Sequence, residues 1–127
     1  MSENICKVSV RLDGPRTVLH STLKLTGCEL SVNNIPAGSA VPFVHSHQDN
    51  EELYLVLEGR GELYLDGEII ALQQGDAFKI APAGKRAIRA AEDCPIRYIC
   101  IQSKAGSLHQ YTERDAVLEK EKAPWHP

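Results

Sequence analysis

Short apolar and alternating stretches, separated by turns at intervals of roughly 8–12 residues, make up most of the chain. The runs 62–65 and 68–71 flank Asp66-Gly67, a pair that favours the tight turn of a β-hairpin. Few segments show the period of an amphipathic helix, so the pattern predicts an all-β fold, either a sandwich or a barrel. The predicted strands are 6–11, 18–25, 29–32, 41–47, 52–58, 62–65, 68–71, 76–80, 86–91 and 97–102.

Only the tail from 112 to 122 has helical character. Thr112 can cap a helix there, and Asp115 stands at the capping-box position. We therefore expect a single domain spanning 1–127, with a barrel core at about 28–103, N-terminal strands within 6–25, and a tail at 104–127 that carries a short helix.

The composition is that of a globular domain and gives no sign of a nucleic-acid-binding or membrane protein. With 43% hydrophobic and 24% charged residues, a chain of 127 residues can form a core without disulfides. Its net charge of −3 does not suggest binding to nucleic acid or to an anionic membrane. No apolar stretch approaches the ~18 residues of a membrane helix, and the N-terminus lacks the basic and apolar regions of a signal peptide. Four cysteines without a CxxC pair predict reduced, largely buried thiols in a cytoplasmic protein.

The sequence His45-Ser46-His47, followed by Glu52, is the most informative chemical pattern. Residues two apart on a strand point to the same face, so the two imidazoles are expected to project together. A short polar link to the next strand favours a hairpin that brings Glu52 back beside them. Two histidines and a carboxylate can hold a divalent metal and leave its opposite side open to water or substrate.

The same residues have a simpler interpretation. A His-x-His sequence is common in proteins that bind no metal. Both histidines are then half-buried strand residues, and Glu51 and Glu52 belong to a solvated turn.

The segment from Gly38 to Gly59 resembles the first motif of the cupin family, in which a glycine precedes His-x-His and a glutamate and a second glycine follow. Gly75, Pro82 and Gly84 resemble the second motif. This resemblance implies a cupin-type double-stranded β-helix, or jelly-roll barrel, that is often dimeric. It also implies a metal at the mouth of the barrel, bound by three histidines and a glutamate.

The resemblance covers residues 30–102 and departs from the family at the third histidine. Counted from Pro82, that histidine would fall at position 87, which is Ala87. The fourth ligand is then water, substrate or a residue from another strand, with Gln102 and His20 as candidates. The cofactor that the resemblance implies is one divalent metal ion, either iron, zinc, manganese or nickel.

Arg86 and Arg89 lie on either side of Ala87. If Ala87 faces the interior, strand alternation places Arg89 on that face and Arg86 on the other. An inward arginine can bind a carboxylate or phosphate through its planar fork, so Arg89 and Arg86 are candidate substrate-binding residues. The other interpretation is that both are solvated charges at a strand edge. Tyr54 shares the facing of Glu52 and is expected either to line the pocket or to belong to the core.

Three classes of function remain open. The chain is predicted to be a metal-dependent enzyme of isomerase or dioxygenase type that acts on a small anionic metabolite. The alternative is a module that binds or senses a small molecule without turnover, and a fragment or structural partner fits least.

The strand 53–57 is apolar on both faces, which predicts that a homodimer covers its outer surface.

Overall fold

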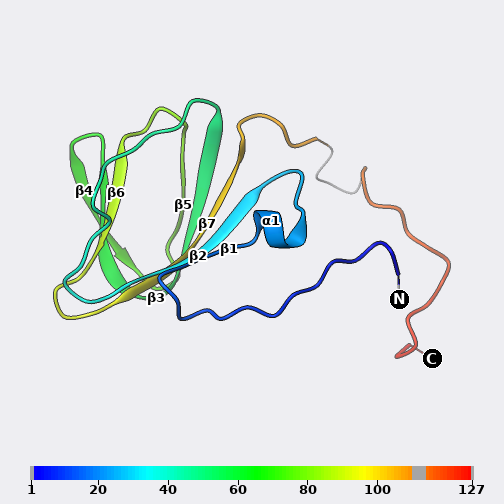
Figure 1. Cartoon of the computed structure of the whole chain (residues 1–127). Helices are drawn as coiled ribbons and strands as arrows, with labels where there is room; N and C mark the ends of the chain where they lie inside the picture. Colours follow the sequence, from blue (N-terminus) through cyan, green and yellow to red (C-terminus); the bar gives the residue numbers. More distant parts are fainter. Residues whose placement is uncertain (1, 110–113, 127) are drawn as a thin grey trace.

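β3 (Asn50–Leu65) is the longest strand and belongs to both layers of the fold (Figure 1). The computed structural model describes residues 2–109 and 114–126. Seven antiparallel strands form one sheet that folds over on itself, because each half of β3 pairs with different neighbours. The first half pairs with β5 (Ala77–Ile80) and β7 (Ile96–Lys104), and the second half pairs with β4 (Glu68–Gln73) and β6 (Arg86–Ala90). Beyond β7, the first layer continues through β2 (Glu29–Ile35) to the short edge strand β1 (Arg16–Val18).

β3 passes from one layer to the other near Gly59. The register between β3 and β7 shifts between Val56 and Glu58, an irregularity typical of a β-bulge. Gly59 has a φ angle of +84°, and a Cβ atom there would lie 1.8 Å from the carbonyl oxygen of Pro95. Only glycine combines this backbone conformation with so close an approach of another chain segment.

Alternation along β3 decides which of its side chains reach the interior. Glu52, Tyr54 and Val56 are buried, whereas Leu53 and Leu55 are exposed on the outer face. Glu52 is therefore a charged group in a largely apolar interior, where an unpaired charge is costly. The core that both layers enclose with Tyr54 and Val56 consists of Ile35, Leu63, Leu72, Ile80, Ile88, Ala90, Ile96 and Tyr98.

The all-β prediction is confirmed, and so is the hairpin at Asp66-Gly67. Asp66 and Gly67 have φ angles of 48° and 91°, and they join β3 to β4. The two predicted strands 52–58 and 62–65 are parts of the single strand β3. The other confirmed predictions correspond to β2, β4, β5, β6 and β7.

Predictions near the N-terminus are wrong in two places. Residues 6–11 form no strand in the structure, and Cys6 within them is exposed rather than buried. The predicted strand 18–25 is interrupted, because β1 ends at Val18 and the short helix α1 (His20–Leu23) follows. The four cysteines all lie in the described part of the chain and are free thiols.

Two further predictions of regular structure are wrong. Residues 41–47 meet β6 through an isolated bridge instead of forming a continuous strand, and Pro42 has no N–H to donate to a ladder. In the tail, the described residues 114–122 form no helix. Thr112, the predicted cap, lies outside the described residues.

Replacing Gly59 by alanine tests the crossing of β3 between the layers. We expect Gly59→Ala to lower the free energy of unfolding by about 1–3 kcal/mol more than Gly67→Ala. Both glycines have positive φ angles, but a Cβ atom at Gly67 meets nothing within 4 Å. The control therefore isolates the clash with Pro95. Urea unfolding of the two variants measures the difference, and equal losses would show that the close approach is unimportant.

Candidate metal site

The two histidines lie on a segment that runs beside β6. The backbone groups of His45 and Arg86 exchange hydrogen bonds of 3.1 and 3.0 Å. The N–H of His47 donates to the carbonyl oxygen of Pro82 at 2.8 Å. These bonds fix the backbone at both histidines. The side chains of His45 and His47 both line the interior cavity, as their spacing predicts.

Glu52 reaches the histidines because the barrel closes, and the predicted hairpin between its strand and the histidine segment is wrong. Around Glu52, β3 pairs with Gln102 of β7 and with Ile80 of β5. The histidine segment pairs with β6 instead. The three predicted ligands therefore meet through tertiary structure, although they are close in sequence.

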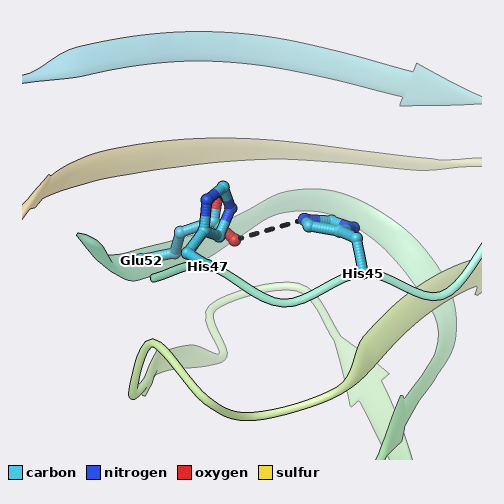
Figure 2. Close-up of side chains that lie close together, drawn as sticks. All are labelled: His45, His47 and Glu52. Carbon is cyan, nitrogen blue, oxygen red and sulfur yellow. Dashed lines mark ion pairs between the residues drawn. The ribbon is translucent and has the colours of Figure 1, made fainter. Parts of the chain in front are cut away.

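The side chains of His45, His47 and Glu52 converge on one point (Figure 2). His47 Nε2 lies 3.2 Å from Glu52 Oε2, and His45 Nε2 lies 3.8 Å from Glu52 Oε1. The two imidazole rings meet edge to face, with their centroids 5.1 Å apart. One ligand atom from each residue lies within 4.8 Å of the other two, a separation that one metal ion can bridge with small adjustments.

Two buried nitrogen atoms support the fit to a metal. His45 Nδ1 and His47 Nε2 are buried and have no hydrogen-bond partner among the residues that the structure describes. A polar atom left in this state is destabilising unless something binds it. Burial lowers the pKa of His45 and outweighs the negative charge of Glu52, which would raise it. The imidazole of His45 is therefore neutral, which is the form that binds metals.

Arg86 faces the interior, so the predicted facing of its strand is wrong. Its side chain is 1% exposed, and its Nη1 donates to Glu52 Oε1 at 2.6 Å. Its Nε donates to the carbonyl oxygen of Gly84 at 3.0 Å, and its Nη2 donates to that of Ala81 at 2.8 Å. Ala87, the next residue along the strand, consequently points away from the cavity.

The error has a simple origin in the second motif. Pro82 stands one residue further from Gly75 than the family pattern has it, so the motif can be counted from either residue. Counting from Pro82 places the third histidine at 87, whereas counting from Gly75 places it at 86. The structure favours the second count, because the side chain of Arg86 contacts Glu52. Arg86 thus stands where the resemblance implies a fourth metal ligand.

Hydrogen bonds hold Glu52 as a charged carboxylate. The hydroxyl of Tyr54 donates to Oε1 at 2.5 Å, and the thiol of Cys100 approaches Oε2 at 3.4 Å. Burial alone would raise the pKa of Glu52, but the bonds from Tyr54, Arg86 and Cys100 outweigh it and lower the pKa. Burial and then the charge of Glu52 raise the pKa of Cys100 to about 12, so its thiol stays neutral, as expected for an inert cysteine.

The Arg86–Glu52 ion pair reduces the negative charge available to attract a metal ion to this site. The guanidinium and the carboxylate neutralise each other within the buried site. A divalent ion bound to Glu52 would share that carboxylate with Arg86 and leave the site with net positive charge. The residues fit a metal, but with a lower affinity than a site whose fourth ligand is a neutral histidine.

The prediction that Arg89 faces the interior is also wrong. Arg89 is exposed and forms an ion pair with Glu62 of β3 on the outer surface. Its side chain does not line the cavity around the histidines. Tyr54 combines its two predicted roles, since it lines this cavity and stacks on Phe78 in the core with 4.9 Å between ring centroids.

A cavity of about 630 Å³ opens beside the three converging side chains. This volume is within the range of small-molecule sites. Of the two candidate fourth ligands, Gln102 lines the cavity and accepts a hydrogen bond from Asn50, whereas exposed His20 of α1 does not line it. No local pattern marks the other polar cavity residues, because they come from segments far apart in the chain: Arg16, Ser31, Asn33, Asn34, Ser39 and Tyr98.

Removing the buried guanidinium tests how far Glu52 depends on it. We expect Arg86→Met to lower the free energy of unfolding by about 3–5 kcal/mol, because it leaves a buried carboxylate without its main partner. The exposed pair offers a matched control, and Arg89→Met should cost less than about 1 kcal/mol. Adding Glu52→Leu to Arg86→Met should recover much of the loss. Urea unfolding measures these free energies. Similar losses in Arg86→Met and Arg89→Met would show that Glu52 does not depend on the buried guanidinium.

The model of the family described as "Cupin domain" matches residues 32–102 of this chain. A solved cupin protein from Bacteroides fragilis is 54% identical, with 93% of this chain and 99% of that one covered and a TM-score of 0.90. A cupin 2 conserved barrel domain protein from Salinispora arenicola is 19% identical over 83% of this chain and 92% of that one, with a TM-score of 0.65.

An uncharacterised protein of Methanocaldococcus jannaschii is 34% identical over 79 residues. The matched stretch spans 62% of this chain and 62% of that relative. Within the described residues, no helix is long and apolar enough to cross a bilayer. The matched family model, the B. fragilis structure and the His45, His47 and Glu52 geometry agree, and this chain belongs to the cupin family.

Proposed function

We propose that the chain is a metal-dependent cupin enzyme that acts on a small anionic metabolite bound in the barrel cavity. The observation that carries the proposal is the convergence of His45, His47 and Glu52. Within it, His45 Nδ1 and His47 Nε2 are buried and have no hydrogen-bond partner among the described residues. His45, His47 and Glu52 would hold one divalent ion. Such an ion supplies Lewis-acid chemistry, or dioxygen chemistry if it is iron, in keeping with an isomerase or a dioxygenase.

The residues around the ion have separate tasks in this proposal. Arg86 keeps Glu52 charged and fixes its Oε1, which leaves Oε2 directed toward His47. Tyr54 donates to the same oxygen and closes the floor of the cavity. His45 and His47 would offer one ring nitrogen each to the ion. Three protein ligands leave room for a substrate atom at the ion, facing the cavity.

A binding module without turnover is the second candidate, and the Arg86–Glu52 pair favours it. With the guanidinium in place, Glu52 already has a counter-charge and needs no further cation. The cavity would then hold its ligand by hydrogen bonds and apolar contacts alone. Metal content distinguishes the two candidates.

Elemental analysis of protein from metal-replete expression tests the enzyme proposal. We expect about one divalent ion per chain in the wild type. His47→Ala should lose it, because two ligands cannot hold the ion against solvent. His20→Ala is the matched control, since exposed His20 lies outside the cavity, and it should retain the metal. Absence of metal from the wild type, or equal content in both variants, would favour the binding module instead.

The identity of the bound ion limits which class of reaction the proposed enzyme can catalyse. Iron would favour oxygen chemistry, whereas zinc or manganese would favour isomerisation. The same elemental analysis gives this information.

We also propose that the chain forms a homodimer through the outer face of its first layer. Leu53 and Leu55 are 45% and 37% exposed, and the ladder places Ile101 and Ile99 beside them. An apolar surface of this kind is costly to leave in water.

Light scattering tests the assembly. The wild type should give twice the 14.0 kDa of one chain. Leu55→Lys should reduce this mass toward that of a monomer, because it places a charge in the interface. Ile69→Lys, at an exposed apolar position of β4, should leave the mass unchanged. A monomeric wild type at all working concentrations would rule the dimer out.

A further inference from the structure

One row of side chains crosses the first layer and ends at Arg16. The ladders place Arg16 of β1 opposite Asn33 of β2, Asn33 opposite Tyr98 of β7, and Tyr98 opposite Val56 of β3. Residues directly opposite one another in an antiparallel ladder project to the same face. Because Val56 and Tyr98 are buried in the interior, the exposed Arg16 also projects to that face, and it lines the cavity from the edge strand β1.

Arg16 has no counter-charge within the cavity that it lines. Glu52 is the only carboxylate among the described residues around this cavity, and Arg86 already neutralises it. No ion pair or hydrogen bond joins the Arg16 side chain to another residue of the described chain. The guanidinium therefore contributes an uncompensated positive charge and unused N–H donors at the cavity wall.

The residues next to Arg16 in the row add polar groups. The hydroxyl of Tyr98 forms no hydrogen bond with the described residues, although its side chain is 7% exposed. Asn33 donates to the hydroxyl of Ser31 at 2.9 Å, which orients the Asn33 amide at the cavity wall. Arg16 and Tyr98 thus offer donors from the two strands on either side of β2.

The cavity that Arg16 and the histidines share has a lining that is more apolar than polar. A ligand that spans the cavity would therefore contact carbon on its way from one end to the other. This favours an organic anion with a hydrocarbon portion over an inorganic ion. The apolar part of the wall consists of Ile35, Pro36, Val41, Pro42 and Phe43.

We infer that Arg16 is the anion-binding residue of this cavity and that it holds the carboxylate of a small organic acid. The remainder of that acid lies along the apolar wall and extends toward His45, His47 and Glu52. This inference rests on the proposed function for the choice of site, but carboxylate binding by Arg16 does not require a metal. Arg16 fills the role that strand alternation assigned to Arg89, from a strand about seventy positions earlier in the chain.

Calorimetric titration of butyrate and benzoate into metal-free and metal-loaded protein tests the inference. We expect both acids to bind the metal-free wild type, and Arg16→Gln to weaken binding at least about tenfold, the loss of a charge-assisted hydrogen bond. Arg60→Gln is the matched control, an exposed arginine paired with Asp93 outside this cavity, and should bind like the wild type. Circular dichroism of each variant checks that the fold is retained.

Several results would overturn the inference. They are failure of the wild type to bind either acid, equal binding by wild type and Arg16→Gln, and a larger loss in Arg89→Gln than in Arg16→Gln. Inorganic phosphate binding as tightly as butyrate would overturn the choice of an organic acid. If the wild type contains no metal yet loses acid binding on Arg16→Gln, the metal proposal fails and the Arg16 inference stands. If the wild type contains metal but Arg16→Gln leaves acid binding unchanged, the Arg16 inference fails and the metal proposal stands.

Discussion

The buried ion pair between Arg86 and Glu52 sets the character of the whole site. Alternation along β3 sends Glu52 inward together with Tyr54 and Val56, into an interior that is largely apolar. A carboxylate there requires strong partners, and the guanidinium is the only fully charged one in contact with it among the described residues. Arg86 in turn satisfies its remaining donors on the carbonyl oxygens of the 81–84 turn, so the pair also fixes the turn before β6.

This pair divides the cavity into two regions of different charge. At the Glu52 end, the charges of Arg86 and Glu52 cancel, and the neutral imidazole of His45 has a lone pair to offer. At the Arg16 end, the positive charge has no partner within the cavity. Because Arg86 already occupies Glu52, it would weaken the binding of a cation there, and it leaves Arg16 without a carboxylate partner in the cavity.

The path of β3 makes these contacts available. The strand contributes Glu52 and Tyr54 to the first layer and then passes to the second at Gly59, where the backbone of Pro95 comes too close for any side chain. The crossing closes the barrel and brings β6, with Arg86, over the Glu52 region of β3. The convergence of the candidate ligands, the ion pair and the cavity are thus consequences of one strand that serves both layers.

The sequence by itself determined the fold class and the three candidate ligands. Alternating apolar positions, the turn at Asp66-Gly67 and the spacing of His45, His47 and Glu52 are local patterns, and local patterns follow from backbone periodicity. Tertiary structure decided the facing of β6, because a strand has a period of two and one additional residue before Pro82 exchanges its faces. It also decided the position of Arg16, since only strand pairing places residue 16 beside residue 33, which in turn lies beside residue 98. No local pattern encodes such a contact, because it depends on how separate strands are ordered in the sheet.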